Sequence, residues 1–301
     1  MRSYLQKLYM KIFKNNIKLF LGMLFGILLT GTSVYAATIL FSSDEVGYDN
    51  TSSGMTATNV QDALDELYSK TPHEVDFATA SWDEIVSAYK AGKTTNLQQA
   101  MVNGVTRDVD LGDFGIHQVR IANLSTPEEC LGQNFSQTAC GFVLEFADII
   151  KTRSIASEDN TMWADMSMRS YINDAIYNSL PTDLKNVIIV TAVVSGGRST
   201  DKVTSVDKLY LLSPKEISKR SAINQYDSAK NLSRQLDYYN RNGTNENNSD
   251  YVKKYNNVDS EWWLRTISSN NGNFMYISTS GEIRYVPSSA TFGVSPAFRI
   301  G

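Results

Sequence analysis

The sequence is poor in the side chains on which most metal and nucleophilic chemistry depends: its 301 residues include 2 cysteines and 2 histidines. A structural zinc site needs a full set of Cys or His ligands, and only His73 and His117 stand beside the cysteines. No serine lies in a Gly-x-Ser-x-Gly elbow, and neither histidine has a local motif around it. We therefore expect no metal site, no cofactor and no catalytic residues.

Basic residues are scarce beyond the N-terminus. The chain has 28 basic and 32 acidic residues and a net charge of -4. Residues 1–36 hold five of the basic residues and no acidic one, which leaves 23 basic against 32 acidic residues, or -9, for the rest. Because nucleic-acid binding requires basic patches that neutralise phosphates, this acidic body argues against nucleic acid as a partner.

The longest apolar run, residues 19–29, follows the basic N-terminus directly. Val34 and Ala36 occupy the positions that a signal peptidase reads. The apolar character continues beyond Ala36, so about 23 residues from Leu19 could span a bilayer of about 30 Å. Residues 1–41 therefore predict either a signal peptide cleaved after Ala36 or a single transmembrane anchor. Either one predicts a secreted protein or a membrane protein with an extracellular C-terminal domain.

Residues 42–71 are expected to form a polar linker with a short amphipathic helix at 58–68, capped by Thr58. Its apolar residues follow the i, i+3, i+4, i+7 pattern of a helix face: Val60, Ala63, Leu64 and Leu67. A helix shorter than about 12 residues seldom holds alone, so this one needs its own domain or copies of itself as a partner. Docking on its own domain is the first expectation; the segment also resembles a connector of phage tail fibres and Gram-positive surface proteins, which supports the alternative of a homo-oligomer.

Residues 72–301 mix helical and strand patterns. A capping box at Ser81 and Glu84 predicts a helix start, residues 167–180 read as a helix, and Ser213 begins another. The residues from 187 to 194 form the most β-branched run and predict a central strand. Further strands are expected at 105–111, 116–122, 143–150, 208–212, 274–278 and 283–286.

The end of the chain is where we expect the core to close, because an apolar last strand is frayed unless a sheet holds it. Trp262 and Trp263 are adjacent, so their rings cannot share one face of a strand. One ring is expected in the core and the other against a second layer or solvent. An exposed ring would be the best binding candidate in the chain.

These residues also carry a resemblance. Trp-Trp-Leu-Arg at 262–265 and Gly-Val-Ser-Pro-Ala-Phe-Arg-Ile at 293–300 resemble the signature of an uncharacterised domain family of unknown function, common in Gram-positive gut bacteria. The resemblance covers roughly residues 72–301. More distantly, the terminus is similar to the C-type-lectin-like fold of lectins and the formylglycine-generating enzyme. It implies an α+β domain with a mixed or antiparallel sheet and flanking helices, but fold does not imply function.

Cys130 and Cys140 are ten residues apart in the segment expected outside the cell. The simplest prediction there is a disulfide, worth roughly 2–3 kcal/mol through its restriction of the unfolded chain. A reactive thiol pair of the formylglycine-generating type is not supported, because these cysteines lie far upstream of the similar terminus.

The other candidates are weak. Glu145 and Asp148 are three residues apart, so a strand would place them on opposite faces. The Asn-rich stretch from Tyr226 to Asp259 reads as a long polar loop. Aligned as a calcium loop, it has Tyr238 and Ser249 where carboxylates are required, which leaves only a looser oxygen site. The candidate ligand-binding residues are Trp262, Trp263, Arg265, Asn271 and Arg299, although each arginine is expected first to pair with a carboxylate or with strand-end carbonyls.

The favoured hypothesis is an exported bacterial surface or secreted protein in which residues 72–301 form a binding module, not an enzyme, for a glycan, cell-envelope or protein ligand. An alternative is a structural or assembly protein, tail-fibre-like, with a stalk made by residues 58–68. An enzyme of unknown reaction is the third hypothesis.

Overall fold

The chain is described from a computed structural model. It describes residues 43–157, 162–196, 202–219, 232–241, 248–267 and 273–301, and before residue 43 only Lys7, Met10, Lys14, Ile17, Leu21 and Met23. The predicted export or anchor segment therefore falls almost wholly outside the described residues, as does Asn271. Among the described residues, no helix combines the length and the apolar character needed to cross a membrane. The chain divides into two compact units, Met1–Pro72 and His73–Gly301.

The first unit is built on α2 (Val60–Lys70). Asn59, not the predicted Thr58, caps this helix, because the Asn59 side chain accepts a hydrogen bond from the Asp62 backbone N–H at 2.8 Å. The preceding loop folds back on α2, and the N–H groups of Thr56 and Ala57 donate to the Glu66 carboxylate at 2.8 and 3.0 Å. Residues 43–57 are thus a folded loop and not an open linker.

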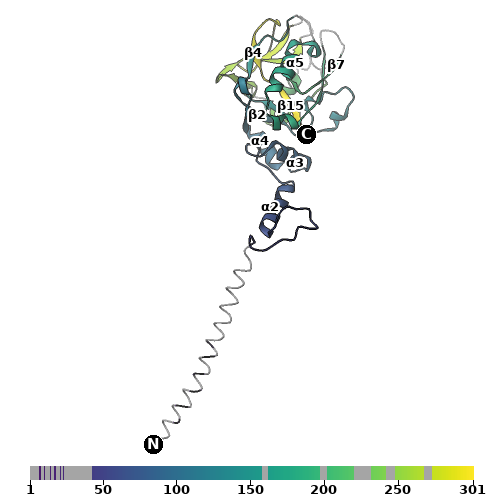
Figure 1. The fold of residues 1–301 in the computed structure, drawn as a ribbon. Coiled ribbons are helices and arrows are strands. Elements are labelled where there is room, and N and C mark those ends of the chain that lie inside the picture. The colour runs from purple at the N-terminus through teal and green to yellow at the C-terminus, as the bar shows by residue number, and fades with distance from the viewer. Residues whose placement is uncertain are drawn as a thin grey trace. The chain divides into compact units, whose positions relative to one another are not determined.

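The second unit is a mixed α+β fold whose strands pair almost entirely antiparallel. One sheet has the order β1-β2-β3-β15-β5, with β8 also paired to β15. Its strands are β1 (Thr106–Asp110), β2 (Ile116–Asn123), β3 (Val143–Phe146), β15 (Ala297–Ile300), β5 (Ile188–Ile189) and β8 (Leu209–Tyr210). Figure 1 shows β15 within this unit, with the C-terminus at its end. The last strand is therefore held in a sheet, as predicted.

A second sheet has the order β13-β12-β11-β14-β4, and β11 and β14 form its parallel pair. Its strands are β13 (Ile283–Val286), β12 (Phe274–Ile277), β11 (Trp262–Ile267), β14 (Phe292–Val294) and β4 (Lys151–Arg153). Two hairpins complete the strands: β6 (Thr191–Gly196) with β7 (Lys202–Asp207), and β9 (Lys253–Tyr255) with β10 (Val258–Ser260).

The helices of this unit are short. They are α3 (Trp82–Lys90), α4 (Thr95–Asn103), α5 (Ser167–Tyr171), α6 (Tyr177–Ser179), α7 (Thr182–Val187), α8 (Pro214–Ile217) and α10 (Asp237–Asn240). A π-helical turn, η5 (Ile172–Ile176), joins α5 to α6. The 3-10 turns are η1 (Gly112–Phe114), η2 (Glu128–Leu131), η3 (Gln137–Ala139), η4 (Trp163–Asp165) and η6 (Asn248–Tyr251).

Several local predictions are confirmed. The Ser81 and Glu84 capping box starts α3, β1 and β2 form the predicted hairpin, and β12 and β13 form another, with Gly281 at φ 75° between them. The helix predicted at 167–180 exists, although its middle turn is π-helical.

Two predictions about longer segments are wrong. Residues 187–194 do not form one central strand: α7 ends at Val187, β5 joins the first sheet, and β6 begins a separate hairpin. The Asn-rich stretch is also not one long loop, because its described parts form α10, η6, β9 and β10. Tyr238, Tyr239 and Tyr251 from that stretch are buried in the core, so aromatic residues between the asparagines hold it on the domain.

Candidate functional site

Neither Trp262 nor Trp263 is exposed, since both have 0% of their surface accessible. Each ring is covered by its own neighbours: the Lys253 Nζ lies 4.4 Å from the centre of the Trp262 ring, and Tyr276 and Phe292 pack on the Trp263 ring. The Trp262 Nε1 donates to the Tyr251 carbonyl at 2.9 Å, and the Trp263 Nε1 donates to the Arg153 carbonyl at 2.8 Å. The exposed ring on which the predicted binding site depended therefore does not exist.

Arg265 is also buried and serves the core. Its Nη1 and Nη2 donate to the two carboxylate oxygens of Glu216 at 2.6 and 2.5 Å, and Nη1 also donates to the Leu211 carbonyl at 2.8 Å. This confirms the prediction that Arg265 pairs with a carboxylate, which was the alternative to ligand binding. Arg299 is half-buried, and its Nη1 donates to the Gln137 side chain at 3.1 Å.

Glu145 and Asp148 serve separate networks. Glu145 is fully buried between Arg120 Nε at 2.9 Å and Lys253 Nζ at 2.7 Å. Burial lowers the pKa of Lys253 to about 8 despite the opposing charge of Glu145. This cluster has the residue types of an acid–base site, yet Glu145 and Lys253 are sealed from solvent. It therefore holds the core together rather than reaching a ligand.

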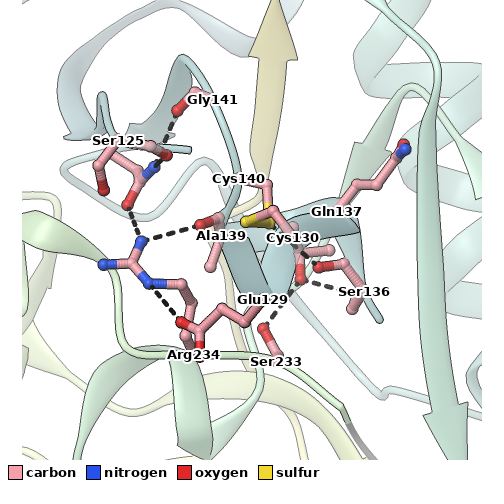
Figure 2. The surroundings of a disulfide bond; sticks show 12 residues. Ser125, Glu129, Cys130, Ser136, Gln137, Ala139, Cys140, Gly141, Ser233 and Arg234 are labelled. Carbon is pink, nitrogen blue, oxygen red and sulfur yellow. Dashed lines mark hydrogen bonds and ion pairs between the residues drawn. A yellow bond between two sulfur atoms is a disulfide. The ribbon is translucent and has the colours of Figure 1, made fainter. Parts of the chain in front are cut away.

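The predicted disulfide is confirmed: Cys130 in η2 is bonded to Cys140, which follows η3 (Figure 2). Arg234 lies beside it and donates to the Ala139 carbonyl at 3.0 Å, and its Nε is 3.2 Å from a Glu129 carboxylate oxygen. Among the residues that the structure describes, no group of three or more His, Cys, Asp or Glu side chains is placed to hold a metal ion.

One pocket on the described surface has a volume of about 500 Å³, and we call it the helix–hairpin pocket. It lies between the α5–η5–α6 helix on one side and the β6–β7 hairpin with its two flanking residues on the other. Its described lining residues are Arg169, Ser170, Asn173, Asp174, Tyr177, Asn178, Val190, Val206, Asp207 and Lys208.

Buried polar contacts fix the two walls of this pocket. The Asn173 amide accepts from the backbone N–H of Lys208 at 2.9 Å and donates to the Leu209 carbonyl at 2.9 Å. Arg169 donates to the Asp207 carboxylate at 2.5 Å, and Trp163 donates to the same carboxylate at 2.9 Å. These contacts join the helix to the hairpin, so the pocket is preformed.

The inner surface of the pocket combines apolar and polar groups. Val190 and Val206 are 58% and 62% exposed. The Lys208 Nζ lies 4.0 Å from the centre of the Tyr177 ring and donates to its hydroxyl at 2.8 Å. Asp174 is exposed on the π-helical turn, a distortion that is frequent at functional sites. Such a site can place a carboxylate and hydroxyls around a ligand that also has apolar faces.

The sequence did not indicate this pocket. Its residues come from a segment that was predicted only as a helix, from Val190 in the run predicted as a central strand, and from residues 206–208, of which only Lys208 lay in a predicted strand.

The fold and the pocket together define a small α+β domain with a preformed, solvent-open polar pocket. A family model described as "Domain of unknown function (DUF6273)" matches residues 143–301, more than half of the sequence, and the chain belongs to that family. This confirms an uncharacterised domain family, although the match begins at residue 143 and not near residue 72. No curated protein and no solved structure matches the chain.

Proposed function

We propose that this chain is an exported bacterial surface or secreted protein whose second unit is a non-enzymatic binding module of C-type-lectin-like type. Its ligand is a glycan of the cell envelope, held in the helix–hairpin pocket. The observation that carries the proposal is the composition of that pocket, in which an aromatic ring and two exposed valines stand beside a carboxylate and amide or hydroxyl side chains.

Sugars present both apolar C–H faces and hydroxyl groups, and this pocket offers a counterpart to each. The Tyr177 ring, Val190 and Val206 can cover C–H faces, while Asp174 can accept hydrogen bonds from hydroxyls. The described lining residues carry two basic and two acidic side chains, which suits a neutral ligand. A volume of about 500 Å³ lies in the range of small-ligand pockets and is small for a protein interface.

The test is a glycan-panel screen with the full chain, followed by calorimetry with the sugars it retains. We expect Tyr177→Ala and Asp174→Asn each to weaken binding about tenfold or more. Tyr285→Ala and Asp259→Asn, which change exposed residues outside the pocket, should leave it unchanged. Equal losses in both pairs, or no retained glycan with folded protein, would remove the proposal.

A second candidate function is assembly through α2, favoured by its open apolar face. Leu64, Leu67 and Tyr68 are 54%, 49% and 64% exposed, and their spacing places them on one side of the helix. We propose that copies of the chain pair through this face. Sedimentation of the full chain should show an oligomer that Leu64→Gln with Leu67→Gln dissociates, whereas a monomer throughout the micromolar range would exclude this role.

A further inference from the structure

A second pocket, which we call the Arg234 pocket, lies beside the disulfide and has a volume of about 340 Å³. Its described lining residues are Glu129, Lys215, Ser218, Lys219, Arg234, Gln235 and Asn240. Among these residues three are basic and one is acidic. The helix–hairpin pocket, in contrast, has two of each among its described lining residues. The Arg234 pocket is therefore a locally basic site on an acidic body.

Arg234 is fixed in place by the protein. Its Nη1 donates to the Asn123 side chain at 2.7 Å and to the Ala139 carbonyl at 3.0 Å. Its Nη2 donates to Asp237 at 2.8 Å, and its Nε faces Glu129 at 3.2 Å. Figure 2 shows the guanidinium directed at Ala139 and Glu129 next to the disulfide. All three guanidinium nitrogens thus have protein partners, and Glu129 and Asp237 balance the charge of Arg234. The net positive charge of the pocket therefore comes from Lys215 and Lys219.

The two lysines provide the adaptable donors. Lys215 is half-buried on α8, and Lys219 follows shortly after that helix. The Lys219 Nζ donates to the Asn240 side chain at 2.5 Å, which places its charge between α8 and α10. An ammonium group acts as a point charge with three donors and is a common ligand of phosphate, whereas planar carboxylate recognition favours an arginine fork.

We propose that the Arg234 pocket binds the phosphate group of a small molecule or of a phosphate-containing polymer. Lys215 and Lys219 contact the phosphate oxygens, while Arg234 holds together the segments that line the pocket. The disulfide contributes indirectly, because Cys130 follows Glu129 and Cys140 follows Ala139, and both of those residues contact Arg234. This site is independent of the proposed glycan pocket, so either one can fail alone.

The experiment is calorimetry of the full chain at constant ionic strength with four probes: inorganic phosphate, glycerol phosphate, acetate and glycerol. Comparing inorganic phosphate with glycerol phosphate shows whether the site prefers free phosphate or a phosphate ester. Acetate tests whether any anion suffices, and glycerol is the neutral control. We expect saturable binding of at least one phosphate probe, weaker binding of acetate and none of glycerol.

Lys215→Gln with Lys219→Gln should weaken phosphate binding about tenfold or more. The matched control is Lys90→Gln with Lys202→Gln, which removes the same charge from exposed lysines of α3 and β7 and should stay within about twofold. Circular dichroism confirms that both variants fold. Equal losses in the two variants, acetate binding as tight as phosphate, or no saturation by either phosphate probe would each overturn the proposal.

Discussion

At the scale of single residues, His117 shows how partners determine charge. Its Nδ1 lies 2.7 Å from an Asp148 oxygen, and its Nε2 lies 2.9 Å from the Phe114 carbonyl oxygen. A carbonyl and a carboxylate both accept, so the protonated ring, in which both nitrogens donate, satisfies both contacts. Burial alone would lower the pKa of His117, but the hydrogen bond and charge of Asp148, with the Phe114 carbonyl, raise it above its ordinary value.

This predicts a pH-dependent contribution to stability. Because the folded-state pKa of His117 is raised, its stabilisation is complete below the unfolded-state pKa of about 6.5 and is lost as pH rises through the folded-state pKa. We expect the gap in unfolding free energy between the natural chain and His117→Gln to shrink from about pH 6 to 9. Urea denaturation across that range measures it, with His73→Gln as the control. A gap that stays constant or widens contradicts the assignment.

At the scale of elements, local rules account for what could be predicted. Capping boxes and turn glycines act over a few residues, so the start of α3 and the β12–β13 hairpin were readable from the sequence. The run at 187–194 was not, because β propensity does not say which strand pairs with which. Ile188 and Ile189 both pair with β15. Thr191, two residues further on, begins a hairpin with β7. Val190, which lies between Ile189 and Thr191, is exposed and forms part of the pocket wall.

The burial of both tryptophan rings could not be predicted from the sequence for the same reason: it depends on tertiary packing. Strand alternation does not say what packs on each ring: Lys253 lies over the Trp262 ring, and Tyr276 and Phe292 pack on the Trp263 ring. The disulfide was predictable because two cysteines allow one pairing. The two pockets were not, because each draws on segments far apart in sequence.

Gly293 in β14 lies where the backbone packs closely against the Ile149 side chain. It pairs with Trp262 across β14 and β11, and a Cβ built on it would lie 2.6 Å from the nearest Ile149 side-chain atom. Gly293→Ala should therefore destabilise the domain by about 1–3 kcal/mol through overpacking. Adding Ile149→Ala should recover part of that loss, giving a non-additive double-mutant cycle. Guanidinium unfolding measures all three variants, and strictly additive losses would show that the two side chains do not meet.

At the scale of the whole molecule, the last strand joins segments from distant parts of the chain. β15 pairs with β3, β5 and β8, so its removal exposes three sets of backbone partners and opens the core around Phe298, which is 0% exposed. We expect a chain lacking residues 297–301 to lose cooperative unfolding and near-ultraviolet circular dichroism, because burial on this scale exceeds a marginal stability of about 5–15 kcal/mol. A chain lacking only Gly301 loses one backbone hydrogen bond, to Val187, and should fold with a loss of about 1 kcal/mol. A cooperative transition with an unchanged midpoint in the longer truncation would mean that the remaining strands of the sheet hold the core without β15.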